Sequence, residues 1–157
     1  MKIMTIMTTS EEETIRLGEQ LGLLLDSGTV ISLVGEMGAG KTHFVQGIAK
    51  GMGITAVVTS PTFTILNYYE APVPLQHFDF YRLDQEEELD GLGFDDYIAE
   101  GVTLIEWADK FPQRLPAKAL KIEIQKKSAT ERTFVFHIPD NTWSKVEKEV
   151  EIYAVSH

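Results

Sequence analysis

The hydrophobic positions along this chain follow two different periods, so the sequence predicts a mixture of strands and helices. Continuous or alternating apolar runs predict strands at residues 3–7, 30–34, 63–70, 75–81, 102–107, 119–125, 132–138 and 149–155. For the last stretch, residues 145–157, a helix packed on the core is the alternative to a strand.

Helices are predicted where apolar residues recur every three or four positions. Ser10 and Glu13 form a capping box, which predicts a first helix that ends near Asp26. A second helix is expected over residues 41–52 and a short acidic one over 85–92.

The apolar runs VISLV (30–34) and VTLI (102–105) are typical of strands buried on both faces of a parallel sheet. The alternating strands near the C-terminus resemble an antiparallel extension instead. We therefore expect an α/β fold, with a central, mostly parallel sheet, antiparallel extensions and flanking helices. No linker or repeat divides the chain, which predicts a single domain over residues 1–157.

Composition narrows the functional classes. Hydrophobic residues make up 43% of the chain and charged residues 24%, as in ordinary globular domains. The net charge of −10 disfavours direct binding to nucleic acid, which requires Lys and Arg, and fits a protein partner with a basic face. The absence of Cys fits a reducing cytoplasm, and we expect neither a membrane span nor a signal peptide.

The strongest chemical signal is the segment GEMGAGKT, residues 35–42, which matches the phosphate-loop pattern G-x-x-x-x-G-K-[ST]. Its glycines allow backbone N–H groups to turn inward around phosphates. Lys41 would contact the outer phosphates, and the Thr42 hydroxyl would bind Mg²⁺. A strand before the segment and a helix after it give the required order, so the sequence predicts a phosphate-loop NTPase.

A phosphate loop needs a carboxylate at the end of a neighbouring buried strand to hold Mg²⁺. Glu106 directly follows the apolar run VTLI and is the first candidate. Asp79 lies among aromatic residues in HFDFYR, where alternation places His77, Asp79 and Tyr81 on one strand face. Such a face is unusual for mere solvation, although a buried structural network is the alternative.

Residues 60–63, SPTF, lie between the phosphate-loop helix and the next strand. In GTPases and related enzymes this position carries a segment whose Thr senses the γ-phosphate through Mg²⁺. On its own, the segment is equally compatible with a proline turn that enters a strand.

Together, GEMGAGKT, SPTF, HFDFYR and LIEW, in this order and spacing, resemble the motifs of the bacterial TsaE proteins. These are small ATPases of the tRNA threonylcarbamoyladenosine pathway. The resemblance extends from the SEEET helix to about Arg132. It implies an ATPase that works with a TsaB–TsaD heterodimer. That pair, with an adenylate-forming partner, places threonylcarbamoyl on the adenosine next to the anticodon in tRNAs that read codons beginning with A. The chain would then meet tRNA only through that complex.

The resemblance also implies roles for individual residues. Asp79, Glu106, Lys41 and Thr62 would be catalytic, and Thr42 and Glu106 would hold Mg²⁺. ATP would be bound by Thr9, Ser10, Glu11, Gly35, Glu36, Met37, Gly38, Ala39, Gly40, Lys41, Thr42, His43, Trp107 and Arg132. His43 replaces a common Thr or Ser of the family, but it follows the ligating Thr42, so we expect no loss of activity.

A small kinase that phosphorylates a metabolite is the alternative function. Such an enzyme needs basic residues on a lid that closes over both substrates. The chain contains only 14 Lys and Arg, and no Arg-rich segment follows the phosphate loop, so the ATPase fits better.

Overall fold

The structure is a computed structural model that describes residues 1–36, 39–61 and 64–156. Its described strands form one seven-stranded sheet in the order β1-β7-β6-β2-β5-β4-β3. The strands are β1 (Lys2–Thr8), β2 (Thr29–Gly35), β3 (Leu66–Tyr69), β4 (Leu75–Asp79), β5 (Val102–Glu106), β6 (Leu120–Lys126) and β7 (Arg132–Ile138). The α-helices are α1 (Glu11–Gly22), α2 (Lys41–Gly51), α3 (Glu87–Gly91), α4 (Phe94–Ile98) and α5 (Ser144–Ser156).

The sheet is mixed rather than mostly parallel. Strands β6, β2, β5 and β4 are parallel to their neighbours in that group. The pairs β1–β7, β6–β7 and β3–β4 are antiparallel. The prediction of a parallel centre with antiparallel extensions is therefore confirmed, but the extensions contribute as many strand pairings as the centre.

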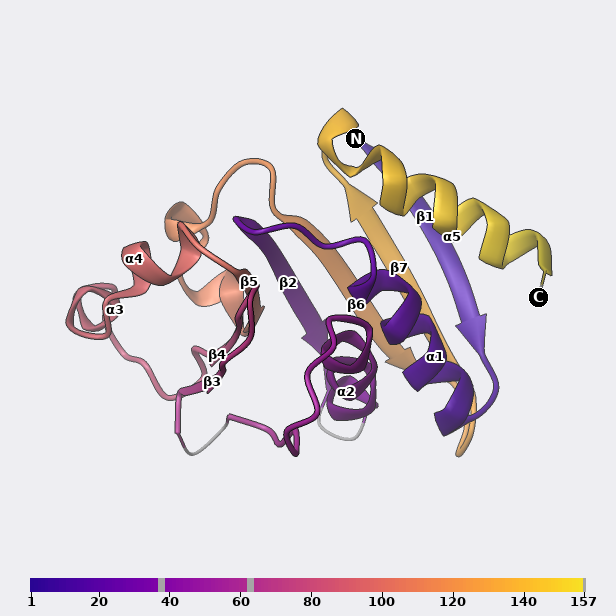
Figure 1. Cartoon of the computed structure of the whole chain (residues 1–157), viewed down its shortest axis with the longest axis horizontal. Coiled ribbons are helices and arrows are strands. Elements are labelled where there is room, and N and C mark those ends of the chain that lie inside the picture. The colour runs from indigo at the N-terminus through magenta and orange to yellow at the C-terminus, as the bar shows by residue number, and fades with distance from the viewer. Residues whose placement is uncertain (37–38, 62–63, 157) are drawn as a thin grey trace.

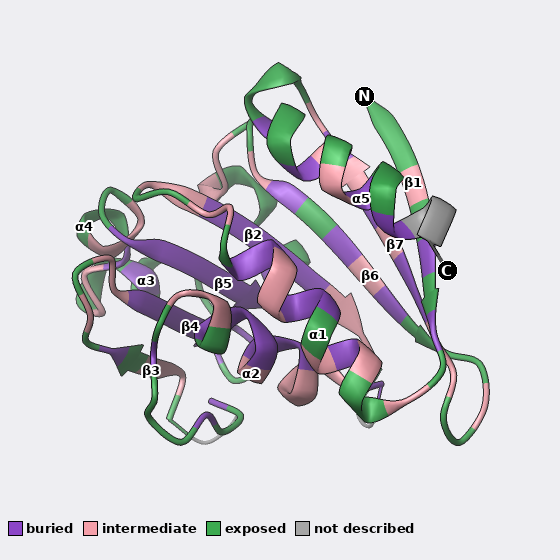
Figure 2. Ribbon diagram, turned by 45° about the vertical axis from the view of Figure 1, so that its right-hand side comes forward, coloured by how far each residue is buried: buried purple, intermediate pink, exposed green. Residues whose placement is uncertain are grey.

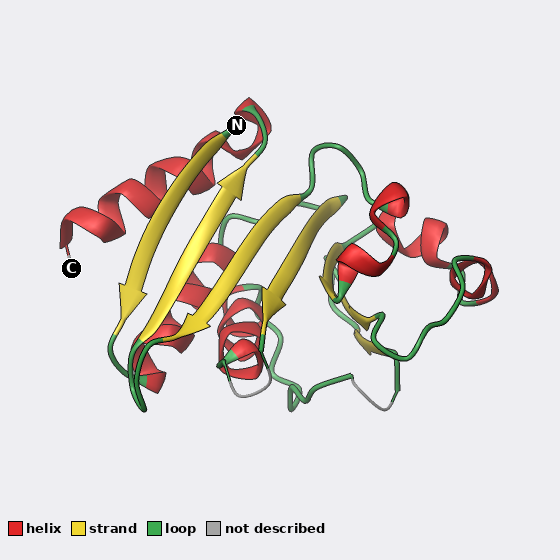
Figure 3. Cartoon of the chain, turned by 180° about the vertical axis from the view of Figure 1, so that it is seen from behind, coloured by secondary structure: helices red, strands yellow, loops and turns green. Residues whose placement is uncertain are grey.

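Helices cover the two faces of the sheet unequally. Helices α1, α2 and α5 lie on one face, and α3 and α4 lie beside the β3–β4–β5 end (Figure 1). Seen from behind, β1, β7, β6 and β2 stand in front of α1, α2 and α5 (Figure 3). Three 3₁₀ turns connect elements among the described residues: η1 (Ala108–Lys110), η2 (Pro112–Arg114) and η3 (Asn141–Trp143).

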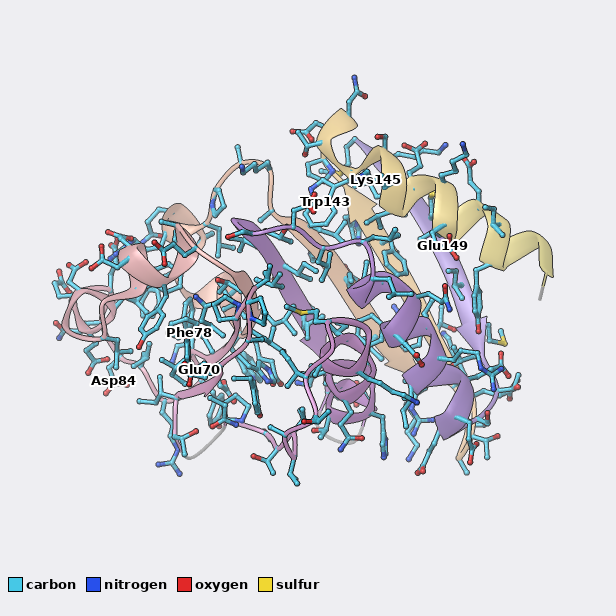
Figure 4. All side chains as sticks on the ribbon, viewed as in Figure 1. Glu70, Phe78, Asp84, Trp143, Lys145 and Glu149 are labelled. Carbon is cyan, nitrogen blue, oxygen red and sulfur yellow. The ribbon has the colours of Figure 1, made fainter. Side chains whose placement is uncertain are left out.

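Each covered face has its own hydrophobic cluster. The larger cluster joins α1, α2 and α5 to the sheet and includes Leu33, Phe44 and Leu104. The smaller cluster includes Phe78 of β4 and Phe80 just after it, together with Leu89 of α3 and Phe94 of α4. Figure 4 shows Phe78 among the side chains between β4 and the α3–α4 segment.

Burial along the strands follows from this layering. Every residue of β4 and β5 is buried, as expected for parallel strands covered on both faces. Figure 2 shows this burial as continuous purple along β5, in contrast to the mixed colours of β6 and β1. In β6 and β7 the apolar residues that face α1 and α5 are buried, while the alternate positions are more open.

Four predicted segments differ from the structure. The strand predicted at 149–155 is wrong, and the alternative of a helix packed on the core is confirmed, because residues 144–156 form α5. Val146, Val150 and Tyr153 are spaced for a helix and pack on the larger cluster, so this face overrides the short alternation in the sequence.

The other three differences concern where elements end. The strand predicted at 63–70 is shortened to β3, and the one at 75–81 ends at Asp79. The first helix ends at Gly22, before the predicted turn at Asp26, and its capping residue is Ser10 as predicted, since Ser10 Oγ accepts a hydrogen bond from the N–H of Glu13 at 3.1 Å.

Within the described part of the chain, no helix has both the length and the apolar run that crossing a bilayer requires.

Candidate functional site

The predicted site residues gather where β2 and its parallel neighbours end. Strand β2 leads into the phosphate-loop segment, and α2 begins at Lys41 (Figure 1). Gly40 caps α2 with φ of 97°, a backbone conformation that other residues rarely adopt. Because Gly40 has no side chain, it leaves the first N–H groups of the helix without a side-chain cap. This arrangement suits an anion at the start of α2.

Lys41 points back toward the sheet. Its Nζ donates to the carbonyl oxygen of Gly35 at 2.7 Å and lies 3.0 Å from Oε1 of Glu106. The Lys41 side chain is 13% exposed, so the ammonium group is partly shielded from water. The phosphate-loop segment and the end of β5 are therefore joined by one charge pair.

Glu106 ends β5 and is 5% exposed. Its Oε2 lies 2.7 Å from Nε2 of His77, on the neighbouring strand β4. Burial raises the pKa of the Glu106 carboxyl, but His77 and Lys41 lower it by more, so its pKa lies below the ordinary value. The environment thus favours the charged carboxylate, the form that binds cations.

Asp79 lies directly beside Glu106. The two residues are register partners in the parallel pair β4–β5, and Asp79 is 3% exposed. Asp79 Oδ1 accepts a hydrogen bond from the N–H of Tyr81 at 2.9 Å. The strand ends therefore bring two buried carboxyl groups to the same edge of the sheet, as the sequence predicts.

The expectation that Tyr81 shares a strand face with His77 and Asp79 is wrong. The chain leaves the sheet after Asp79, and Tyr81 is 56% exposed. Its ring lies 5.1 Å from that of Trp107, whose backbone is left-handed with φ of 59°. Lys110 ties the two segments together, because its Nζ donates to the carbonyl oxygen of Tyr81 at 2.8 Å.

A cleft of about 520 Å³ opens between Trp107 and the ends of β2 and β6. It is lined by Leu33, Val34, Gly35, Glu36, Lys41, Trp107, Asp109, Glu123, Ile124, Gln125 and Lys126. Four of the predicted nucleotide-binding residues, Gly35, Glu36, Lys41 and Trp107, thus face one cleft.

Other predicted ATP-binding residues that the structure describes lie around the start of α2. Arg132 begins β7, and its Nε donates to the carbonyl oxygen of Ala39 at 2.8 Å. His43 Nε2 lies 3.8 Å from a carboxylate oxygen of Glu11. Thr9 and Ser10 connect β1 to α1, next to Glu11. Arg132, Glu11 and Glu106 therefore each contact a residue of the phosphate-loop segment or of the first turn of α2.

Four further predicted site residues are either half-buried or outside the described part of the chain. Thr42 is half-buried in the first turn of α2. Met37, Gly38 and Thr62 lie outside the described residues. Close to Thr62, Ile65 has φ of 69°, which is strained for a β-branched residue.

The sequence identified His77 as part of an unusual strand face but gave it no role. In the structure it is 1% exposed and directly contacts the predicted metal ligand Glu106. The signal available in the sequence was its position two residues before Asp79, which places both side chains on one face of β4.

The donor set suits a hard cation. Glu106, Asp79 and the Thr42 hydroxyl all offer oxygen, the ligand type that Mg²⁺ prefers. Among the described residues, no group of three or more His, Cys, Asp and Glu side chains is arranged to hold a metal ion.

Comparison with known proteins gives the family. A sequence model described as "Threonylcarbamoyl adenosine biosynthesis protein TsaE" matches residues 8–134. A protein of Bacillus subtilis named tRNA threonylcarbamoyladenosine biosynthesis protein TsaE is 38% identical over 152 residues, covering 96% of this chain and 95% of that protein. A protein of the same name from a Nostoc species is 44% identical over 115 residues, 69% of this chain and 70% of that protein.

The crystal structure of Bacillus subtilis YdiB has a similar fold. It superposes with a TM-score of 0.81 and 33% sequence identity, covering 97% of this chain and 96% of that one. Together with the sequence matches, this shows that the chain belongs to the TsaE family of threonylcarbamoyl adenosine biosynthesis proteins.

Proposed function

We propose that this protein is a phosphate-loop ATPase of tRNA threonylcarbamoyladenosine biosynthesis. It would bind and hydrolyse Mg-ATP and thereby drive the cycle of a TsaB–TsaD heterodimer. Family membership supports the pathway, and the phosphate-loop motif supports the nucleotide.

The observation that carries the proposal is the contact between Lys41 Nζ and Glu106 Oε1 at 3.0 Å. It joins the cation of the phosphate-loop motif to the carboxylate at the end of the adjacent strand. In phosphoryl transfer, catalysis comes mainly from positioning the reactants and from stabilising charge. Lys41 would stabilise the negative charge of the phosphates, and Glu106 would bind the metal ion.

Individual roles follow from chemistry and position. Lys41 would exchange Glu106 for the outer phosphates, and Glu106 and Thr42 would hold Mg²⁺, which neutralises the charge that develops on the phosphates. Asp79, buried beside Glu106, would orient the attacking water or a water on the metal. Arg132, His43 and the segment before α1 would contact the nucleoside.

The charge of the chain supports the proposal that other subunits bind the tRNA. With 24 acidic and 14 basic residues, the protein has little to offer a polyanion, so tRNA would be held by the other subunits. The protein would then act in the cytoplasm, within the complex that modifies tRNA.

Reconstitution tests the proposal. A tRNA that reads codons beginning with A is incubated with the adenylate-forming partner, the TsaB–TsaD pair and ATP, with and without this chain. We expect repeated turnover of modified adenosine only when the chain is present, together with release of inorganic phosphate. The same amount of modified tRNA in both reactions would contradict the proposal. ADP formed without phosphate, only when a small metabolite is added, would favour a kinase.

A further inference from the structure

His77 lies in the interior of the sheet, beside the proposed metal ligand. It is the third residue of β4 and is 1% exposed. Its Nε2 lies 2.7 Å from Oε2 of Glu106, although the angle between them is not that of an ordinary hydrogen bond. Within the described part of the chain, neither ring nitrogen has another hydrogen-bond partner. The contact with Glu106 is thus the polar interaction that the structure gives to this buried ring.

The two oxygens of Glu106 have different neighbours. Lys41 Nζ lies 3.0 Å from Oε1, and His77 Nε2 lies 2.7 Å from Oε2. Lys41 belongs to the phosphate-loop motif and would turn to the phosphates when ATP binds. His77 belongs to the fully buried strand β4, where it would not contact the phosphates. ATP would therefore release Oε1 and leave Oε2 held.

We propose that His77 is a positioning residue, which holds Oε2 of Glu106 so that Oε1 faces the metal ion of Mg-ATP. The inference rests on the proposed function, because it concerns the same metal site. Groups that contact a metal ligand from behind fix its orientation, and their loss commonly lowers metal affinity. Here the buried carboxylate would otherwise rotate about its side-chain bonds once Lys41 had left.

Two substitutions separate positioning from simple filling of space. In His77→Gln, the amide nitrogen replaces Nε2 at nearly the same distance along the side chain. In His77→Asn, the amide nitrogen replaces Nδ1 and falls short of Glu106. Thr103→Val is the matched control, because Thr103 is fully buried in β5 and its hydroxyl has no hydrogen-bond partner among the described residues.

The experiment measures ATP affinity by calorimetry, with Mg²⁺ titrated from zero, on the full chain. For His77→Asn we expect the Mg²⁺ concentration that gives half the maximal effect to rise about 10- to 100-fold. ATP affinity in excess chelator should stay unchanged, because His77 is 1% exposed and would not reach the phosphates or the nucleoside. His77→Gln should recover most of the Mg²⁺ effect, and Thr103→Val should match the parent.

A double substitution tests the inference independently of whether one single variant folds correctly. In a Glu106→Gln background, His77→Asn should cause no further loss of the Mg²⁺ effect, since the two residues act through one carboxylate. The inference is overturned if His77→Asn responds to Mg²⁺ like the parent. It is equally overturned if His77→Asn and His77→Gln lose ATP affinity alike in chelator. If the parent itself binds no Mg-ATP, the proposed function has failed instead.

Discussion

At the scale of single residues, the site is organised by one buried carboxylate with two cationic or polar neighbours. Glu106 meets Lys41 with one oxygen and His77 with the other. Removing one partner of a buried charge pair leaves the other charge uncompensated. Substituting any of these three residues should therefore also affect its partners.

Lys41→Ala should remove most ATP affinity, because the phosphates lose their main cationic partner. Loss of a buried charge-assisted interaction costs about 3–5 kcal/mol, which corresponds to a fall of at least about 100-fold in affinity. Calorimetry with Mg-ATP measures the change. Lys50→Ala is the control on the same helix, since Lys50 lies at the far end of α2 and pairs with Glu19 at 3.7 Å. Unchanged affinity in Lys41→Ala would exclude the phosphate-loop assignment.

Glu106→Gln should keep the shape of the side chain but lower Mg²⁺-dependent hydrolysis by about 10²- to 10³-fold, as expected when a preorganised charge at a reacting centre is lost. Single-turnover release of phosphate measures the rate. Glu123→Gln is a control on the wall of the same cleft, where Glu123 pairs with His137 at 3.0 Å. If Glu106→Gln hydrolyses ATP at the parental rate, the metal site lies elsewhere.

The sequence predicted Lys41, Glu106 and Asp79 as a group because a phosphate-loop motif and two strand ends have recognisable patterns. It did not predict the contact between His77 and Glu106. That contact depends on the register of β4 against β5, in which Asp79 pairs with Glu106 and His77 with Leu104. Register arises from packing across the sheet, which one strand's sequence does not specify.

At the scale of elements, the site rests on the close packing of α1 and α2 over the sheet. Two glycines from each helix meet along the contact, and added side chains would collide with backbone oxygens of the other helix. A Cβ on Gly18 would lie 2.4 Å from the carbonyl oxygen of Phe44, and one on Gly47 would lie 2.1 Å from that of Ile15. Since α2 starts at Lys41, this contact sets where the helix presents its N-terminus.

Gly47→Ala should therefore destabilise the protein, although Ala favours helix more than Gly does. Overpacking costs about 1–3 kcal/mol, and the melting temperature should fall by about 2–4 °C per kcal/mol. Thermal unfolding followed by circular dichroism measures the shift. Gly91→Ala in α3 is the matched control, because nothing lies within 4 Å of its added Cβ, and it should leave stability unchanged or slightly raised. A parental melting temperature for Gly47→Ala would refute the close contact.

Elements with one strong period were predicted best from the sequence. The buried runs of β2 and β5 and the capped start of α1 lie as expected. Helix α5 was misassigned because Val150 and Ile152 alternate with Glu149 and Glu151, which is a strand pattern over a short stretch. Over the longer stretch from Val146 to Tyr153, the apolar residues recur at helical spacing and pack on the core, so the segment forms a helix.

At the scale of the whole molecule, the candidate site lies where β2, β5 and β6 end and α2 begins, and part of it is exposed. Trp107 is 43% exposed and Tyr81 is 56% exposed, next to the cleft that contains Lys41. Exposed aromatic residues beside a candidate nucleotide site offer a contact area for a partner. A partner that docks here would sense which nucleotide is bound.

We therefore expect the isolated protein to be a slow ATPase that a TsaB–TsaD pair accelerates. Unassisted enzymes of the phosphate-loop class hydrolyse nucleotide slowly until a partner completes the site. The N–H of Asp79 donates to the carbonyl oxygen of Ile65 at 2.8 Å. A partner that contacts the surroundings of Ile65 would act through this bond on Asp79, a proposed catalytic residue.

The complex should also form more readily with ATP than with ADP, because a partner that contacts a γ-phosphate-dependent surface binds one state preferentially. Pull-downs with tagged TsaB–TsaD in ATP, in ADP and without nucleotide measure this preference, and Lys41→Ala should abolish it. Glu70→Lys serves as a surface control, on an exposed residue that follows β3. Equal capture in all three conditions, with no rise in hydrolysis, would contradict the proposed partnership with TsaB–TsaD but not the proposed nucleotide site. A preference for ATP that survives in Lys41→Ala would place the nucleotide response outside the phosphate-loop segment.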